Sequence, residues 1–212
     1  MVVCFIIAYL LGAVSFGYIA GRVLRGIDIR NYGSGNVGAT NVLRTLGKGP
    51  GIVVLLLDMA KGVIAVTVVP WAFLKINGGF LPISIELLKI LCGVSAVAGH
   101  IWTVFLRFKG GKGVATTVGV FFGLTWISML IAMAIFLIVV GVTRYISAGS
   151  IALGITLLAA NLLLRYPPEY VILSGVVALL IIYTHRSNIR RLMSGTENKL
   201  GKKAEAIEES SE

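Results

Sequence analysis

Long apolar runs constrain this sequence more than any other feature. A membrane-spanning helix needs about 20 apolar residues, because it rises 1.5 Å per residue across a hydrocarbon core about 30 Å thick. Hydrophobic residues make up 57% of the 212-residue chain and charged residues only 13%, whereas about a quarter of a soluble domain is charged. The sequence therefore predicts an all-α fold, a polytopic integral membrane helical bundle with no large soluble domain.

Six apolar runs follow one another along the chain. Polar segments separate them, and each of these except residues 144–145 contains glycine or proline. The runs cover residues 2–20, 52–74, 85–106, 114–143, 146–164 and 170–183. The fourth run would be about 45 Å long as a single helix, which exceeds the thickness of the hydrocarbon core. We expect this run to form two short helices that leave the membrane on the face where they entered.

The distribution of basic residues supports this arrangement. If residues 114–143 turn back, 15 of the 19 Lys and Arg residues lie on one face and three on the other, with Lys61 inside a run. A single crossing would place nine on each face. Because cytoplasmic loops carry the excess of Lys and Arg, the sequence predicts seven hydrophobic segments, the fourth and fifth short. The N-terminus would lie outside the membrane, and the C-terminus on the cytoplasmic side.

The remaining composition narrows the class of protein. Residues 1–196 are predicted to form a single membrane domain, and residues 197–212 a charged cytoplasmic tail without hydrophobic periodicity. Basic loops account for the net charge of +10 without a nucleic-acid partner. The spacing of Cys4 and Cys92 fits no zinc site, and we expect no metal and no cofactor. Residues 1–9 lack the basic region of a secretory signal.

Three polar segments fall on the predicted cytoplasmic face, and the first is GSGNVGATNVLR at residues 33–44. Its glycines allow the backbone to approach a ligand closely. Neutral hydrogen-bonding groups come from Ser34, Asn36, Thr40 and Asn41, and Arg44 adds a planar cationic fork. This set suits a hydroxylated, phosphorylated small molecule. The simpler alternative is a loop that caps the next helix, but capping requires neither four polar groups nor an arginine.

The second segment is FKGGKGVATT at residues 108–117, where three glycines surround Lys112 just before a helix. Consecutive backbone N–H groups at a helix N-terminus form a nest for an anion. Gly113 stands where a Walker A motif needs Ser or Thr, so ATP hydrolysis is not indicated. A basic loop that only orients the helices is the alternative.

The third segment, HRSNIRRLMSGTE at residues 185–197, is expected to continue the last apolar helix out of the membrane. His185 and Asn188 lie on one face of that helix, and Glu197 is nearby. His185 could be a base, a phosphate donor or a residue of the membrane boundary. The arginines alone would be ordinary anchors to anionic headgroups.

Three ionisable residues lie inside the apolar runs. Asp58 and Lys61 are three residues apart, and His100 is near the end of the third run. Ionisable residues inside a membrane are functional candidates. An ion pair that braces the site and a buried, hydrogen-bonded histidine are the alternatives that we prefer.

Together these motifs resemble the acyl-phosphate-dependent glycerol-3-phosphate acyltransferase family of bacterial membranes. The resemblance is carried by SGNVGATNVLR at 34–44, LDMAK at 57–61, GH at 99–100, FKGGKGVAT at 108–116 and HRSNIRRLMSGTE at 185–197. Two positions depart from the family pattern. Thr103 stands where the family usually has proline, and Ser187 stands where an acidic residue is common.

The resemblance implies transfer of a fatty acyl group from acyl phosphate to the 1-hydroxyl of glycerol 3-phosphate. The products would be lysophosphatidic acid and phosphate, in the first acylation of phospholipid synthesis. Acyl phosphate would bind at Gly110, Gly111, Gly113, Thr40 and Asn41. Glycerol 3-phosphate would bind at Ser34, Arg44, Lys112, His185 and Asn188. Partners would be these substrates and membrane lipid, in a bacterial cytoplasmic (inner) membrane. Whether a soluble enzyme that forms acyl phosphate docks on the cytoplasmic face is left open by the sequence.

Acyl phosphate is already activated, so direct attack by the substrate hydroxyl is favoured over an acyl-enzyme. The catalytic candidates are His185, Asn36 and Glu197, and the proton acceptor is His185, Glu197 or the departing phosphate. A transporter of a phosphorylated solute is the alternative function, because short, glycine-interrupted helices also point at anions in transporters. The sequence contains no convincing pair of matched halves.

Overall fold

The computed structural model describes residues 1–201, whose regular structure is entirely helical. The helices are α1 (Val2–Ala13), α2 (Phe16–Arg25), η1 (Ile29–Asn31), α3 (Ala39–Thr45), α4 (Lys48–Ile76), α5 (Ile85–Ile101), η2 (Val104–Leu106), α6 (Val114–Leu124), α7 (Trp126–Thr143), α8 (Ile146–Leu163), α9 (Pro168–Thr184) and α10 (Arg186–Met193). Of the predicted tail, residues 202–212 lie outside the described residues.

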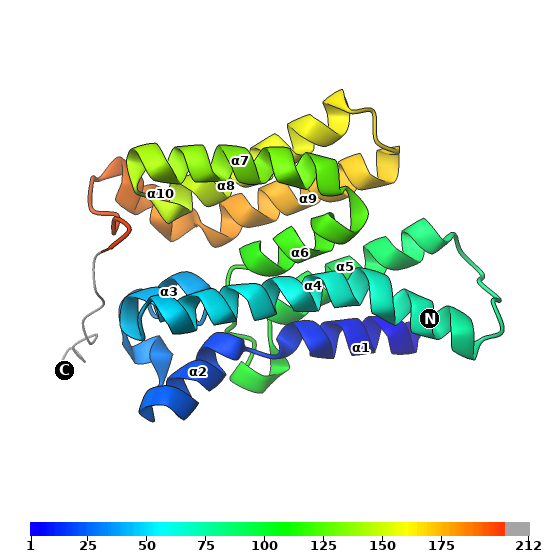
Figure 1. The fold of residues 1–212 in the computed structure, drawn as a ribbon, viewed down its shortest axis with the longest axis horizontal. Helices are drawn as coiled ribbons and strands as arrows, with labels where there is room; N and C mark the ends of the chain where they lie inside the picture. Colours follow the sequence, from blue (N-terminus) through cyan, green and yellow to red (C-terminus); the bar gives the residue numbers. More distant parts are fainter. Residues whose placement is uncertain (202–212) are drawn as a thin grey trace.

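The long helices form two layers with α6 between them (Figure 1). One layer contains α1, α4 and α5, and the other contains α7, α8 and α9. The helix α6 packs closely on α4 because glycines lie at the contact: a Cβ atom at Gly62 or at Gly119 would overlap a backbone carbonyl of the other helix. Small residues permit such close approach of helices inside membranes, where hydrophobicity gives little drive for association.

Five helical segments of the described chain are long and apolar enough to cross a membrane, or six if the bent pair α9–α10 counts as one crossing. The 30-residue run divides at Thr125, as predicted, into α6 and α7. The helix α6 has only 11 residues, and α7 has 18, near the lower limit for a span. Because α7 returns toward the end where α6 began, Met1 and α10 lie at opposite ends of the bundle (Figure 1).

The first apolar run is broken between α1 and α2, which the sequence did not indicate. Two distant side chains satisfy the carbonyl oxygens at the break. Thr103 donates through Oγ1 to the oxygen of Ala13 at 2.7 Å, and Lys61 donates through Nζ to the oxygen of Val14 at 2.9 Å. Irregular backbone at membrane depth needs such partners, so Thr103 has a structural role at its unusual position.

The prediction that the third polar segment continues the last helix is wrong. The axes of α9 and α10 differ by 60° at His185. The oxygen of Ile181 explains the bend, because it accepts hydrogen bonds from side chains of both Thr184 and His185. Side chains that enter the backbone hydrogen-bond ladder bend helices. The bend leaves His185 at the corner, facing the space between the two layers.

Candidate active site

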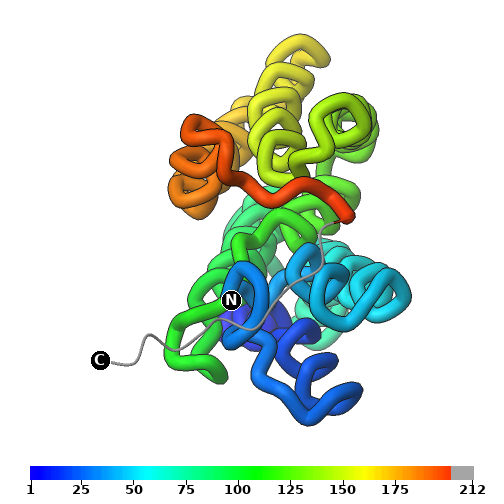
Figure 2. Tube along the Cα trace, turned by 90° about the vertical axis from the view of Figure 1, so that its left-hand side faces the viewer, coloured from blue at the N-terminus to red at the C-terminus, as the bar shows by residue number. Residues whose placement is uncertain are grey.

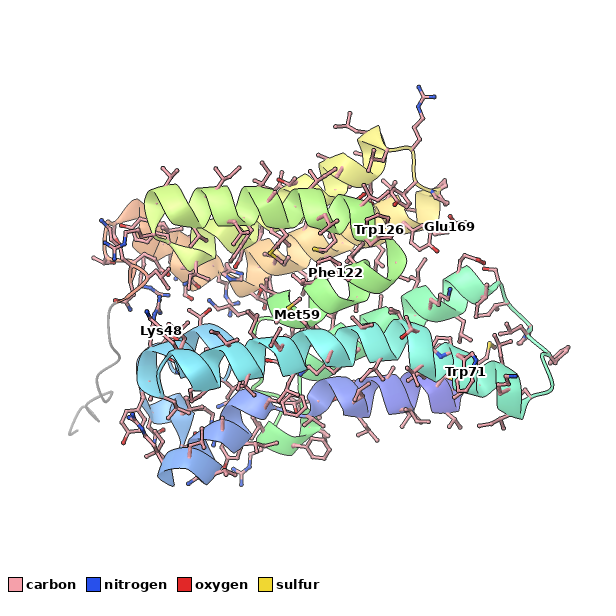
Figure 3. The ribbon with its side chains drawn as sticks, in the orientation of Figure 1. Lys48, Met59, Trp71, Phe122, Trp126 and Glu169 are labelled. Atoms are coloured by element: carbon pink, nitrogen blue, oxygen red, sulfur yellow. The ribbon has the colours of Figure 1, made fainter. Side chains whose placement is uncertain are left out.

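The three predicted segments meet at the end of the bundle that holds α3 and α10 (Figure 1). They enclose two adjoining cavities of about 400 and 390 Å³, and Ser34, Asn36 and Lys112 line both. Lys48, which begins α4, lies at this end, whereas Trp126 and Glu169 lie at the other end (Figure 3). Residues distant in the sequence therefore form one site, as the sidedness of the polar segments predicted.

The larger cavity has a polar end and an apolar arm. Asn36, Arg44, His185, Asn188 and Glu197 line the polar end. The arm runs between α4 and α7 and is lined by Leu55, Met59, Met133, Phe136, Leu137 and Val140. Met59 projects from α4 toward the other layer (Figure 3), and Leu137 is 61% exposed. The cavity can hold an anionic headgroup at one end and an alkyl chain along the arm.

Asn41 organises the first segment. Its side chain is 1% exposed, and Nδ2 donates to the oxygens of Ile29, Tyr32 and Asn36 at 3.1, 2.9 and 2.9 Å. Its Oδ1 accepts from the Ser34 amide at 3.0 Å. Because every polar group of Asn41 bonds to backbone, this residue shapes the loop. Ser34, Asn36 and Thr40 are the groups that the loop offers to the cavity.

The glycine segment, residues 108–113, is hydrogen-bonded to the C-terminal end of α5. Gly110 and Gly111 donate their N–H groups to the oxygens of Ile101 and His100, both at 3.0 Å. A Cβ atom at Gly111 would overlap the His100 ring. The predicted nest of consecutive free N–H groups is therefore wrong for these two glycines, because helix carbonyls occupy both donors.

The backbone N–H groups suited to an anion follow these two glycines in the chain, at the start of α6. Gly113 precedes this helix with φ +82, and Gly113, Val114 and Ala115 line the larger cavity. The first N–H groups of a helix have no partner within it, and the helix dipole favours negative charge there. Lys112 stands beside this N-terminus. Burial lowers the pKa of Lys112 to about 8, although the Glu197 carboxylate opposes the shift.

His185 is held in one orientation. Its side chain is nearly buried, and Nδ1 is 2.8 Å from the oxygen of Ile181. Since a carbonyl oxygen can only accept, we assign the ring proton to Nδ1, which leaves a lone pair on Nε2. The neutral ring therefore presents Nε2 as the atom able to accept a proton.

Asn188 links the second and third segments. Its Oδ1 accepts a hydrogen bond from Lys112 Nζ, and its Nδ2 donates to Glu197 Oε1 at 2.7 Å. The amide therefore orients the lysine on one side and is oriented by the glutamate on the other.

The Glu197 carboxylate is fully engaged. Besides Asn188, Ser147 donates to Oε1 at 2.9 Å and Arg191 donates to Oε2 at 2.7 Å. Burial alone would raise the pKa of Glu197, but these hydrogen bonds outweigh burial and hold the pKa below its ordinary value. No sequence pattern indicates Ser147, which is a lone serine near the start of an apolar run.

Arg44 reaches the same network from α3. It donates through Nη2 to the backbone oxygen of Asn198 at 3.0 Å. Its Nε is buried and has no hydrogen-bond partner among residues 1–201. Arg44 also lines the larger cavity, so its guanidinium can meet an anionic ligand there.

Asp58, Lys61 and His100 form a buried charged cluster beside the site. Lys61 Nζ lies 2.8 Å from Asp58 Oδ1, in a close ion pair rather than an aligned hydrogen bond. His100 Nδ1 lies 3.6 Å from the same oxygen. The cluster connects α4 to the break at Val14 and, through His100, to the glycine segment. This geometry fits the expected bracing role.

Comparison with known proteins gives relatives across almost the whole chain. A family model described as glycerol-3-phosphate acyltransferase matches residues 2–195. A glycerol-3-phosphate acyltransferase of Halalkalibacterium halodurans is 46% identical over 202 residues, covering 93% of this chain and 94% of that protein. One of Parasynechococcus marenigrum is 44% identical over 198 residues, covering 93% and 89%.

Two solved structures have the same fold. Both are of PlsY (YgiH), an integral membrane glycerol 3-phosphate acyltransferase. Its glycerol 3-phosphate form has a TM-score of 0.83 and 39% identity, covering 94% of this chain and 95% of that chain. Its lysophosphatidic acid form has a TM-score of 0.80 and 37% identity, covering 95% of both. These similarities confirm the predicted all-helical, polytopic membrane fold and the family resemblance.

Proposed function

Because this chain belongs to the glycerol-3-phosphate acyltransferase family, we propose that it makes lysophosphatidic acid with acyl phosphate as the donor and the 1-hydroxyl of glycerol 3-phosphate as the acceptor. The observation that carries the proposal is the form of the larger cavity. It joins an apolar arm to a polar end that contains a helix N-terminus, Lys112 and Arg44. Such a cavity accommodates one amphipathic and one fully polar phosphate compound side by side.

The donor would lie along the arm. Its alkyl chain contacts the apolar side chains between α4 and α7, and its phosphate meets the first turn of α6 and Lys112. Thr40 adds a hydroxyl at the edge of this subsite. Asn41, Gly110 and Gly111 act indirectly in this proposal, because their polar backbone or side-chain groups are engaged elsewhere.

The acceptor would lie toward the polar end. Arg44 and Lys112 contact its phosphate, and Ser34, His185 and Asn188 surround its glycerol portion. This assignment places two cations on a dianionic group. It also places Nε2 of His185 beside the hydroxyl that reacts.

In the proposed reaction, the 1-hydroxyl oxygen attacks the carbonyl carbon of acyl phosphate. The new ester C–O bond forms as the C–O bond to phosphate breaks, and the electron pair leaves with inorganic phosphate. The hydroxyl proton passes to Nε2 of His185 or to the departing phosphate, and the Asn36 amide polarises the carbonyl. Lys112 and the α6 N-terminus stabilise the charge on the leaving group. Positioning supplies much of the acceleration, since no covalent intermediate is needed.

The basic end of the bundle would face the cytoplasm. Most Lys and Arg residues belong to segments at the end that contains the site, among them α2, α3 and α10 (Figure 1). The positive-inside rule places this end in the cytoplasm. Glycerol 3-phosphate would then enter from the cytoplasm. A soluble enzyme that forms acyl phosphate could deliver the donor to the same face.

The identity of the acyl donor can be tested with purified protein in detergent. Release of inorganic phosphate from palmitoyl phosphate that requires glycerol 3-phosphate supports the proposal. Acylation of glycerol 3-phosphate from palmitoyl-coenzyme A, with none from palmitoyl phosphate, contradicts it. The transporter alternative predicts uptake of glycerol 3-phosphate into vesicles without formation of a lipid product.

A further inference from the structure

Residues 196–201, which we call the C-terminal strap, lie beyond residues 2–195 matched by the family model. The strap leaves α10 and crosses the end of the bundle between the two layers. Figure 2 shows it in red, running in front of the green helices toward the cyan ones. Its Glu197 and Leu200 line the larger cavity. The strap therefore begins within the motif at 185–197, runs past the residues that the family model matches, and forms part of the site wall.

Backbone hydrogen bonds fix the strap at its far end. The Leu200 amide donates to the oxygen of Arg144 at 2.7 Å, and Arg144 Nη2 donates back to the Leu200 oxygen at 3.2 Å. Lys199 Nζ lies 5.7 Å from the centre of the Tyr145 ring, within range of a cation–π contact. Glu197 anchors the near end through Asn188, Arg191 and Ser147. The strap thus has a defined path between α10 and the turn that joins α7 to α8.

Between these anchors the strap contacts Arg44. The backbone oxygen of Asn198 accepts from Arg44 Nη2 at 3.0 Å, and Arg44 Nε remains buried and unpaired within the described chain. A guanidinium is planar, so one fixed N–H group largely sets the direction of the others. The long arginine side chain otherwise loses considerable rotamer freedom when it binds a ligand.

We propose that the strap is a positioning element for glycerol 3-phosphate: the carbonyl of Asn198 holds the Arg44 guanidinium so that its remaining N–H groups face the substrate phosphate. The inference rests on the proposed role of Arg44. An inhibitory strap is the competing interpretation. It is disfavoured because the neutral Asn198 carbonyl accepts from only one N–H group of Arg44. An inhibitory segment would be expected to place an anion against the guanidinium, where the substrate phosphate binds.

The test compares two shortened chains. The chain that stops after Gly201 keeps the whole strap, whereas the chain that stops after Glu197 loses residues 198–201 and keeps the Glu197 anchor. Both carry a new terminal carboxylate, so the full chain with Leu200→Pro is a third variant without one. It lacks the amide that bonds to Arg144. Initial rates give KM for each substrate and kcat, and thermal unfolding monitors the fold.

Loss of the strap is expected to raise KM for glycerol 3-phosphate roughly three- to tenfold, the net scale of one ordinary hydrogen bond, because the Asn198 carbonyl acts on the substrate only through Arg44. KM for palmitoyl phosphate should change less than about twofold, and the chain that stops after Gly201 should match the full chain. In Arg44→Lys protein, removing the strap should add little, because residues that act through one contact are not additive.

The outcomes separate the inference from the function on which it rests. If Arg44→Lys raises KM for glycerol 3-phosphate but strap removal does not, the positioning role is wrong and the role of Arg44 stands. A fall in KM on strap removal identifies an inhibitory strap and also overturns the inference. If Arg44→Lys itself leaves KM unchanged, both assignments fail.

Discussion

The side-chain amide of Asn188 donates to Glu197 Oε1 at 2.7 Å, while its oxygen accepts from Lys112. This relationship fixes the direction of the Asn188 amide, because only one of its two ends can donate. It also occupies the carboxylate that the sequence offered as a proton acceptor. We therefore treat Glu197 as a residue that positions Asn188 and Lys112.

Replacing Glu197 with Gln distinguishes positioning from proton transfer. If Glu197 positions its neighbours, Glu197→Gln should raise KM for glycerol 3-phosphate several-fold and leave the pH dependence of kcat unchanged, since the amide keeps the size and one acceptor. If Glu197 accepted the proton, kcat should fall about a hundredfold or more. Steady-state rates between pH 5 and 9 separate the two results. Glu169→Gln, at the opposite end of the bundle, is the matched control.

Lys112 predicts a pH dependence with a defined sign. Because its pKa is about 8, the ammonium is charged below that pH and loses its charge above it. We expect kcat/KM for acyl phosphate to fall as the pH rises through about 8. Lys112→Arg should retain its charge through pH 9 and shift the decline upward, whereas Lys112→Ala should lose about tenfold or more at pH 7. An unchanged alkaline limb in Lys112→Arg would show that another group causes the decline.

The ion pair between Asp58 and Lys61 predicts asymmetric effects on stability. Lys61 is 1% exposed, so Lys61→Met leaves a buried carboxylate without its main partner and should cost about 3–5 kcal/mol. Asp58→Asn in the same chain removes the uncompensated charge and should recover part of this loss. Thermal unfolding in one detergent measures both variants. A double variant that is less stable than Lys61→Met alone would contradict this electrostatic explanation.

Because Gly111 packs on the His100 ring, we expect the enzyme not to tolerate a side-chain methyl group at position 111. Gly111→Ala would place a Cβ atom against the His100 ring, displacing the segment that carries Lys112. We expect at least tenfold lower kcat/KM for acyl phosphate, on the scale of a displaced reacting group. Gly49→Ala is the control, because its Cβ would meet nothing within 4 Å and alanine favours the helix. Equal activity of the two variants would remove Gly111 from the account.

Membrane orientation can be measured with single cysteines. Cys4 and Cys92 are buried, and after their replacement Asn77→Cys and Ser194→Cys report on opposite ends of the bundle. We expect a membrane-impermeant maleimide to label position 77 in intact cells and position 194 only after permeabilisation. The reverse pattern would place the site outside and contradict the positive-inside assignment.

Local patterns predicted the apolar runs that form the long helices and the meeting of the three polar segments. The bend at His185 was missed although its contacts are local, whereas two other failures depend on contacts between distant residues. The division of residues 114–143 followed from length and charge. The break at Val14 could not be predicted, because Thr103 and Lys61 satisfy its carbonyls from other helices. The free N–H groups expected at Gly110 and Gly111 are absent for the same reason, since carbonyls of α5 occupy both.

The site residues show the same limit. The segment 33–44 contains four polar side chains of similar chemistry, and all four line the larger cavity. The sequence could not tell that both ends of the Asn41 amide are engaged by backbone groups. Ser147 and the Asn198 carbonyl carry no sequence signal, because a lone serine and a backbone oxygen are common to every kind of chain.

The central claim is that one cavity holds both phosphate substrates together and that the acyl group passes directly between them. Initial rates of phosphate release, measured while both palmitoyl phosphate and glycerol 3-phosphate are varied, test it most directly. We predict double-reciprocal lines that intersect and no phosphate release from palmitoyl phosphate alone. Parallel lines, with a burst of one phosphate per enzyme in the absence of glycerol 3-phosphate, would show an acyl-enzyme and contradict the claim.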